Sequence, residues 1–195
     1  MKTLLTTLGL LLLLASCGAE PIAGNTPSLQ DRLRNPLFAE RYWSEMAEHM
    51  ADFVRRNDTL AKDPEKGPII EAERVRALER VTEARERKDE GISGGMLPVE
   101  EDIIGQVLLR ESTLYTSSDF LAYPNPSVRV YLSTAIDPRD VNFPDTTSVD
   151  LGSLQSPYGA QEYVVPEEKL RDDFASVVFY DTRLDRILGF AQLSK

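Results

Sequence analysis

The sequence predicts an α+β protein, in which an N-terminal antiparallel helical hairpin is followed by an antiparallel β-sandwich or barrel-like domain. Three observations lead to this prediction. Apolar residues recur at spacings of three and four in residues 35–90, whereas short β-branched and aromatic runs separated by turn signals fill residues 103–195. Between these parts, residues 91–95 contain three glycines, which end a helix and allow a change of direction. Residues 91–102 are therefore expected to be a linker between two structural units.

The N-terminus has the layout of a secretory signal that ends in a lipid attachment site. Lys2 gives the positive start, and the apolar stretch from Leu4 to Leu14 is too short to be a membrane span. Two small residues then lead into Cys17, the only cysteine of the chain. This order resembles the lipobox of bacterial lipoproteins and predicts that residues 1–16 are removed and that Cys17 carries acyl chains such as palmitate. The alternative is an ordinary secretory signal, which would leave one free thiol in an oxidising compartment.

The predicted lipid on Cys17 makes a membrane the first expected partner. Acyl chains anchor a protein firmly, because each buried methylene contributes roughly 0.8 kcal/mol. Gly18 is not the Asp that commonly retains Gram-negative lipoproteins at the inner membrane. We therefore expect an extracytoplasmic position in a bacterial envelope, on the outer membrane or cell surface, with an envelope protein as a further partner. Residues 17–34 are interpreted as the lipidated cysteine and a flexible tether, since they show no sustained apolar period.

The composition excludes several functional classes. His49 is the only histidine, which rules out a multi-histidine metal or haem site and leaves the serines of residues 103–195 without a histidine partner in that unit for a Ser-His-Asp set. After Cys17 there is no thiol for a disulfide or a thiolate metal site. The net charge of −10 argues against a nucleic-acid partner, which requires a basic surface. No catalytic residue is assigned, and the sequence favours a protein that is not an enzyme.

Residues 35–90 are expected to form two helices. Asn35 and Pro36 match an N-cap followed by a proline at the first helical position, and this helix should run to about Asn57. The apolar residues expected on its buried face are Phe38, Tyr42, Met46, Met50, Phe53 and Val54. A second helix is expected from about Pro68 to about Glu90, with a narrower apolar stripe. A short connection favours antiparallel packing, and His49 is interpreted as a flanking or packing residue and not as a ligand.

Residues 103–195 are expected to consist of short strands joined by turns. The expected strands are 103–110, 114–115, 120–123, 128–132, 161–165, 176–180 and 186–193. Clusters of Pro, Asn, Asp and Gly separate them. Many short strands without an intervening helix favour an antiparallel sandwich or barrel.

Several short motifs of this unit resemble, in their order and spacing, the DM13 domain, an extracellular β domain found in many bacterial lipoproteins. The motifs are Val128–Thr134, Val149–Leu154, Gly159–Pro166, Ser176–Tyr180 and Gly189–Leu193. The resemblance implies a β fold and an electron-transfer or redox role that depends on a cysteine near the end of strand 176–180. This sequence has Asp181 at that position, and a carboxylate cannot cycle through thiol and disulfide states.

Acidic residues are the candidates for a metal site. Asp137, Asp140, Asp145 and Asp150 cluster around a proline-rich loop, and carboxylates with backbone carbonyls suit a calcium ion. Asp181 and Asp185 flank a turn and are candidates for holding a metal or for pairing with Arg183 and Arg186. Ordinary turn chemistry and solvated acidic loops are the alternative explanation for both groups. No cofactor is predicted, with calcium or a redox cofactor as the alternative.

These observations favour an envelope-anchored lipoprotein that acts as a non-catalytic binding or scaffolding module. The alternative is an extracytoplasmic electron-transfer or redox accessory domain, which the family resemblance implies. The tyrosines of the β unit are interpreted as packing residues, with sugar binding or electron relay as the alternative.

Overall fold

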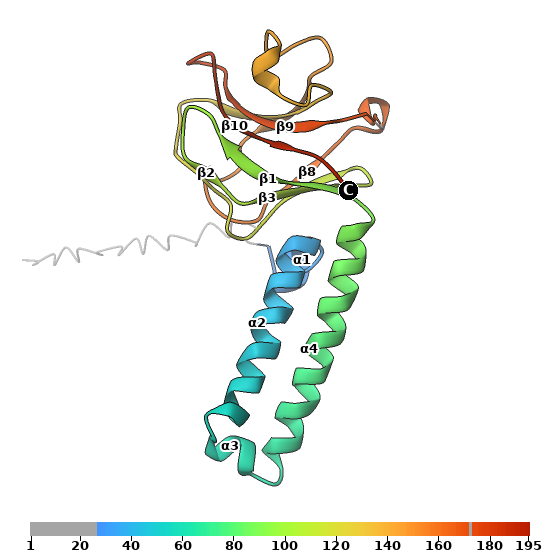
Figure 1. Ribbon diagram of the computed structural model, residues 1–195, viewed down its shortest axis with the longest axis vertical. Helices are drawn as coiled ribbons and strands as arrows, with labels where there is room; N and C mark the ends of the chain where they lie inside the picture. Colours follow the sequence, from blue (N-terminus) through green and yellow to red (C-terminus); the bar gives the residue numbers. More distant parts are fainter. Residues whose placement is uncertain (1–26, 172) are drawn as a thin grey trace, which may run out of the picture.

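The computed structural model describes residues 27–171 and 173–195. An antiparallel hairpin of two long helices projects from one side of a β domain (Figure 1). The helices are α1 (Leu29–Arg32), α2 (Pro36–Arg55), α3 (Thr59–Lys62) and α4 (Lys66–Asp89). The predicted α+β class, with the helices preceding an antiparallel β domain, is confirmed. The predicted signal peptide, the lipidation of Cys17 and the first part of the tether lie outside the described residues. Within the described part, no helix combines the length and the apolar character needed to cross a membrane.

The start of α2 is fixed both to its own first turn and to the β domain. Asn35 is buried, and its Oδ1 accepts hydrogen bonds from the backbone N–H groups of Leu37 at 3.0 Å and Phe38 at 3.3 Å. Its Nδ2 donates to the backbone carbonyl oxygen of Thr116 at 2.8 Å. The predicted N-cap is confirmed, and the same amide joins the hairpin to the β domain.

The two long helices pack through small side chains. The buried residues in the middle of the hairpin are Ala39, Ala47, Ala77, Val81 and Ala84. The bulky residues expected to form the buried face, Phe38, Tyr42, Met46, Met50 and Phe53, are only partly buried, and Val54 is exposed. That expectation is wrong, because an apolar period identifies one side of a helix without showing which part of that side meets the partner helix.

Two short helices occupy segments in which the sequence indicates irregular structure. Helix α1 lies within the expected tether and starts after Ser28, which forms a reciprocal capping box with Asp31. Helix α3 lies in the connection between α2 and α4, with Asp58 as its N-cap. Single helical turns of this kind depend on local caps and are too short to show an apolar period.

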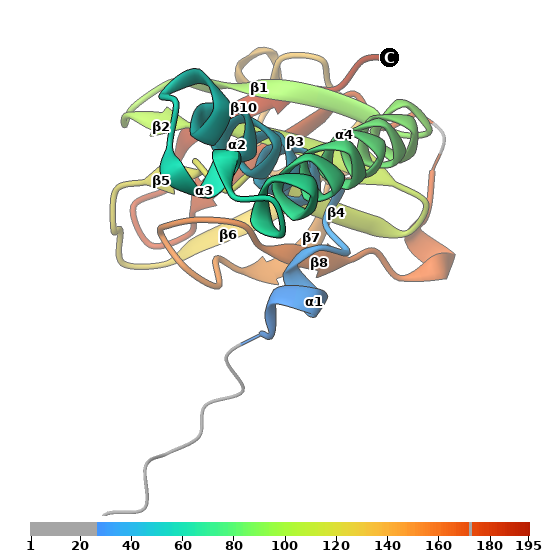
Figure 2. The same ribbon diagram turned by 90° about the horizontal axis from the view of Figure 1, so that it is seen from below.

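The β domain contains ten strands within the described residues. They are β1 (Ile92–Pro98), β2 (Ile103–Ile104), β3 (Gln106–Arg110), β4 (Thr113–Thr116), β5 (Leu121–Ala122), β6 (Val128–Ser133), β7 (Val149–Ser153), β8 (Glu162–Val164), β9 (Ser176–Asp181) and β10 (Arg186–Gln192). Eight of them form one antiparallel sheet in the order β7-β6-β9-β10-β1-β3-β4-β8, which curves until it is nearly closed, while β2 pairs with β5. Seen from below, α2 and α4 lie side by side under this sheet (Figure 2).

Strand β1 lies in the segment that the sequence indicates as a linker. Its first part, Ile92–Gly95, pairs with β3, and Met96–Pro98 pairs with β10, so that β1 joins two parts of the curved sheet. A Cβ atom on Gly94 would lie 2.0 Å from the carbonyl oxygen of Gln192. The linker prediction is wrong because glycines at a strand corner, where backbones approach closely, look the same in sequence as glycines at a domain boundary.

Two further differences concern the strands. The single strand expected over 103–110 is divided into β2 and β3 at Gly105, whose φ of 117° is unfavourable for other residues. Strand β7 is absent from the expected set, although it pairs along β6 with a register shift between Val130 and Tyr131. The other expected strands agree with β4, β5, β6, β8, β9 and β10 to within a few residues.

The main core lies inside the curved sheet. Phe120 and Phe179 are almost fully buried there, with their ring centroids 5.2 Å apart. Side chains bridge the gap between the edge strands β7 and β8. The Tyr163 hydroxyl donates to Gln161 Oε1 at 2.8 Å and accepts from the Gln155 backbone N–H at 3.2 Å. Two short 3-10 helices, η1 (Pro138–Asp140) and η2 (Glu167–Lys169), lie in the connections outside the sheet.

Candidate functional site

The four acidic residues around the proline-rich loop do not converge on one point. Asp137 pairs with Arg139, with 2.9 Å between Oδ1 and Nε, and Asp150 pairs with Arg129, with 2.7 Å between Oδ2 and Nε. Asp140 lies exposed in η1. Within residues 27–171 and 173–195, no group of three or more His, Cys, Asp or Glu side chains is arranged to hold a metal ion. The geometry therefore gives no support to a shared calcium site.

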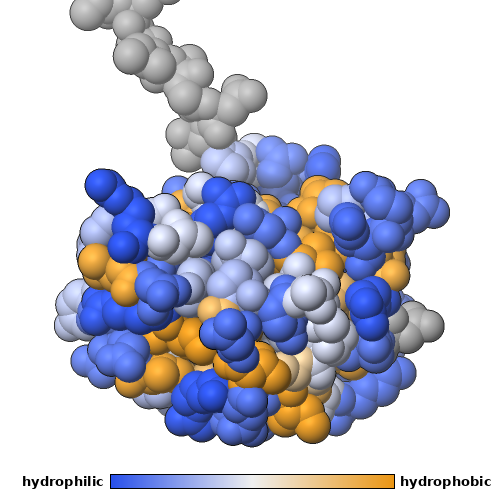
Figure 3. All heavy atoms as spheres, turned by 90° about the horizontal axis from the view of Figure 1, so that it is seen from above, coloured by the Kyte–Doolittle hydropathy of each residue, from blue (hydrophilic) through white to orange (hydrophobic). Residues whose placement is uncertain are grey.

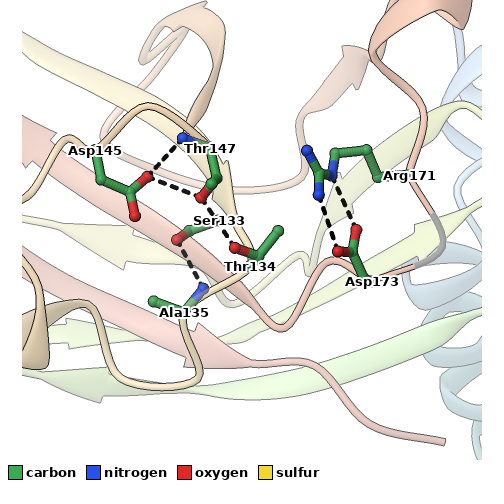
Figure 4. A network of polar contacts seen from close by, with 7 residues as sticks. All are labelled: Ser133, Thr134, Ala135, Asp145, Thr147, Arg171 and Asp173. Carbon is green, nitrogen blue, oxygen red and sulfur yellow. Dashed lines mark hydrogen bonds and ion pairs between the residues drawn. The ribbon is translucent and has the colours of Figure 1, made fainter.

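Asp145 is engaged by the turn that follows it (Figure 4). Its Oδ1 accepts hydrogen bonds from the Thr147 backbone N–H at 2.9 Å, the Thr147 hydroxyl at 2.8 Å and the Ser148 hydroxyl at 2.9 Å. The Thr147 hydroxyl also lies 2.9 Å from that of Thr134 on the neighbouring segment. Burial acts to raise the pKa of Asp145, but these hydrogen bonds outweigh it and hold the pKa below its ordinary value. This carboxylate has a structural role in the loop.

Asp181 closes the turn between β9 and β10 from the inner side of the sheet. It is fully buried, and its Oδ1 accepts hydrogen bonds from the backbone N–H groups of Arg183 at 2.8 Å and Leu184 at 3.1 Å. Its Oδ2 is also buried and finds no hydrogen-bond partner among the described residues. Asp181 therefore provides the acceptor that a tight turn needs.

Asp185 and Arg186, at the start of β10, do not pair with each other or with Asp181. Asp185 has a φ of 53°, and its Oδ1 accepts a hydrogen bond from the Tyr180 hydroxyl. Arg186 pairs with Glu101 and donates to Asn125 Oδ1 at 3.1 Å. The expected pairing of Asp181 and Asp185 with Arg183 and Arg186 is thus replaced by other contacts. Glu101 and Asn125 were not predicted, because nothing in the sequence shows that their loops meet β10.

An aromatic cluster lies on the outer face of the sheet beside this turn. Its members are Tyr131 on β6, Tyr180 on β9 and Phe143 in the connection between β6 and β7, which we call the outer aromatic cluster. The ring centroids lie 6.1 Å apart for Tyr131 and Tyr180, 5.4 Å for Phe143 and Tyr180, and 5.5 Å for Tyr131 and Phe143. The two tyrosines share a face because side chains alternate along a strand, a signal that the sequence contains. Phe143 comes from an irregular loop and has no such signal.

The two tyrosines of this cluster are buried, with 7% of Tyr131 and 5% of Tyr180 exposed. Burial, together with the hydrogen bond to the Asp185 carboxylate, raises the pKa of Tyr180 to about 12. Burial also raises the pKa of Tyr131, and the nearby Asp150 carboxylate acts in the same direction. Both phenols are therefore protonated at neutral pH.

The described structure defines a two-part protein. A nearly closed antiparallel β domain carries a hydrogen-bonded phenol–carboxylate pair on its outer face, in which Tyr180 is buried and Asp185 is exposed, and a helical hairpin projects from the domain. Residues 99–193 match the family model described as Electron transfer DM13. The match covers the β domain except β1 and none of the hairpin, and it confirms the resemblance to the DM13 domain. No curated protein and no solved structure shows significant similarity to the chain.

A redox centre held by cysteine or histidine does not fit the matched residues. Residues 99–193 contain neither of these residue types, so they offer no thiolate or imidazole ligand for haem, copper or an iron–sulfur cluster. A cavity of about 300 Å³ near the β9–β10 turn is lined by residues 124–128 and 153–157. Its walls are largely Pro and Ser with one Val and one Leu, and its volume lies at the low end for a small-molecule site. Residues 99–193 therefore cannot hold a redox centre through Cys or His side chains.

Proposed function

We propose that this protein is a lipid-anchored accessory of an extracytoplasmic electron-transfer system, and that its β domain takes part without a thiol of its own. The match of residues 99–193 to an electron-transfer family carries this proposal. The absence of Cys and His from the matched residues restricts the form that the activity takes. The domain then serves a partner that supplies the oxidant or reductant, and it neither stores a redox metal nor forms a disulfide.

The anchor is the second part of the proposal. The order of the N-terminal residues up to Cys17 supports removal of residues 1–16 and acylation of Cys17 in a bacterial envelope. Labelling cells with an alkynyl palmitate analogue tests this directly. The wild-type chain should be labelled and recovered with membranes, and Cys17→Ser should be unlabelled and released. Equal labelling of both chains would contradict the anchor.

The electron-transfer function is tested by comparing membranes from cells that contain or lack the protein. We expect the rate at which a surface-accessible one-electron acceptor such as ferricyanide is reduced to fall in membranes that lack it. Re-expression of the wild-type chain should restore the rate, and Cys17→Ser should not. Rates that do not depend on the protein would overturn the proposal.

Partner binding without electron transfer is the second candidate function, and the hairpin favours it. Phe38, Tyr42, Met46 and Phe53 lie only partly buried along one side of α2, with the rings of Phe38 and Tyr42 stacked at 6.2 Å. The face of the β domain seen from above, opposite the hairpin, shows apolar patches separated by hydrophilic side chains (Figure 3). A crosslinking experiment on whole cells distinguishes the candidates: a stoichiometric partner bound to the hairpin, together with protein-independent acceptor reduction, would favour the scaffolding function.

A further inference from the structure

We propose that Tyr180 is the residue of the β domain that carries the electron, and that Asp185 accepts the phenolic proton when the electron leaves. This inference deepens the proposed function and rests on it, since it names the side chain through which the domain would take part in electron transfer. It is drawn from the placement of this pair beside Tyr131 and Phe143.

The phenol and the carboxylate are held together by the backbone. Tyr180 is 5% exposed, and its hydroxyl donates a hydrogen bond to Asp185 Oδ1. Asp185 sits at the end of a turn with a left-handed φ of 53°, and the turn is fixed by Asp181, which accepts hydrogen bonds from Arg183 and Leu184. The proton donor and acceptor are therefore positioned before any reaction takes place, which is the arrangement that proton transfer requires.

The chemistry balances with one oxidant and one base. A one-electron oxidant on a partner protein takes an electron from the Tyr180 ring, the phenolic O–H bond breaks, and the proton goes to Oδ1 of Asp185. The products are a neutral phenoxyl radical and a neutral carboxylic acid, and return of an electron from a donor reverses both transfers. Without a base within hydrogen-bond reach, oxidation would leave a positive charge in a buried site, which is costly.

The surroundings of Tyr180 are suited to this step. The ring of Tyr131 is 6.1 Å away and that of Phe143 is 5.4 Å away, so the Tyr180 ring packs among other aromatic rings, while its hydroxyl faces the exposed carboxylate of Asp185. The charged or titratable groups that act on it are Asp185, Tyr131 and Asp181. Burial and the hydrogen bond to Asp185 raise the pKa of Tyr180 to about 12, so loss of the proton before the electron is even less favourable than for an ordinary tyrosine.

Tyr163 shows what a purely structural tyrosine looks like in the same domain. It is 3% exposed, and its hydroxyl donates to the amide oxygen Oε1 of Gln161 at 2.8 Å. An amide oxygen does not take up a proton at neutral pH, so Tyr163 lacks a base. Tyr123 and Tyr158, by contrast, are 52% and 59% exposed. Tyr180 therefore differs from Tyr163 in its partner and from the exposed tyrosines in its burial.

The test uses the full chain in detergent and a photogenerated one-electron oxidant, ruthenium tris-bipyridine with persulfate. Samples are frozen within milliseconds, and the tyrosyl radical is measured by electron paramagnetic resonance in the wild type, Tyr180→Phe, Asp185→Asn and the control Tyr163→Phe. We expect Tyr180→Phe to remove most of the early radical. Asp185→Asn should slow its formation about tenfold or more, because the proton acceptor is lost. Tyr163→Phe should match the wild type.

Each result decides the proposal. Asp185→Asn preserves the size of the side chain, so near-ultraviolet circular dichroism should show a folded protein, and an unchanged rate of radical formation in this variant would overturn the role of Asp185. Early radical that persists in Tyr180→Phe, on Tyr123 or Tyr158, would overturn the role of Tyr180.

The acceptor-reduction assay on membranes tests the proposed function separately from this inference. If it depends on the protein but not on Tyr180, the proposed function stands and this inference is wrong. If the radical forms on Tyr180 while acceptor reduction does not depend on the protein, the site chemistry stands and the proposed function is wrong.

Discussion

The helical hairpin and the β domain are stabilised in different ways. The β domain buries Phe120, Phe179 and Phe190 almost completely. The hairpin buries mainly alanines in its middle, and the large side chains of α2 remain partly exposed along one side. Since the free energy gained by burial rises with the apolar area removed from water, the β domain has the larger hydrophobic stabilisation per buried residue.

The comparison shows that the hairpin depends on its attachments. Glu40 on α2 pairs with Arg85 and Lys88 on α4, and Asn35 ties the first turn of α2 to Thr116 in the β domain. These contacts are few, and the ion pairs are partly exposed, so each contributes little alone. The only tryptophan, Trp43, lies in α2, so its fluorescence reports on the hairpin while far-ultraviolet circular dichroism reports on the whole chain.

The largest effect is expected for Phe179→Ala. Its side chain is fully buried in the β domain, so truncation should lower the free energy of unfolding by about 3–5 kcal/mol, as the lost burial and the resulting cavity add up. Urea unfolding followed by circular dichroism measures this change. The matched control is Phe53→Ala on α2, which is only partly buried and should cost clearly less. Equal losses would show that Phe53 contributes as much to stability as the core residue Phe179 and would remove the contrast between the two parts.

A smaller loss, about 2 kcal/mol, is expected for Asn35→Ala. The change removes an N-cap acceptor and leaves the buried carbonyl of Thr116 without its donor. Hydrogen exchange should accelerate in the first turn of α2, and Trp43 fluorescence should change at a lower urea concentration. The control is Asp58→Ala at α3, which removes a cap with no contact to the β domain and should cost less. Similar losses in both variants would mean that the Asn35–Thr116 contact does not couple the two parts.

The alanine interface of the hairpin is tested by Ala77→Leu. Ala77 is 0% exposed between the helices, so the larger side chain should force them apart at a cost of about 1–2 kcal/mol. Ala72→Leu is the matched control, because Ala72 lies exposed on the same helix and leucine has nearly the same helix propensity. The unfolding midpoint reported by Trp43 should fall in the first variant only. A more stable Ala77→Leu variant would show that the hairpin has room at its centre.

The sequence was informative where local rules decide the structure. Asn35 with Pro36 predicted a cap that the structure confirms, and alternation predicted most strands. It failed where contacts between distant segments decide. Gly94 belongs to a strand corner because Gln192 approaches it, and α2 turns its alanines toward α4 because those side chains allow the closest approach.

The candidate site divides in the same way. Asp181 and Asp185 were identified as turn residues from their spacing, but the hydrogen bond from Tyr180 depends on the left-handed backbone of Asp185. Phe143 reaches the outer aromatic cluster from an irregular loop, which no periodicity could reveal. The acidic residues 137–150 share a stretch of sequence, yet each carboxylate has its own surroundings.

The smallest effect concerns the pH dependence of the hairpin and depends on Glu40. Burial raises the pKa of Glu40, but the hydrogen bonds from Lys88 and Arg85 outweigh it and hold the pKa below its ordinary value of 4.5. A carboxylate with a lowered pKa in the folded state stabilises the protein at neutral pH, and this contribution is lost as the pH falls below 4.5 and through the folded pKa. The two ion pairs should contribute no more than about 1 kcal/mol, because they are partly exposed.

Unfolding followed by Trp43 fluorescence between pH 7 and pH 3 should therefore show a smaller loss of stability in Glu40→Gln than in the wild type. Glu45→Gln serves as the control, since among the described residues Glu45 pairs with Arg41 on its own helix and with no residue of α4, so this change should leave the wild-type pH dependence unchanged. If Glu40→Gln lost as much stability on acidification as the wild type, the pairs between α2 and α4 would not stabilise the hairpin, and its persistence would depend on the alanine interface and Asn35 alone.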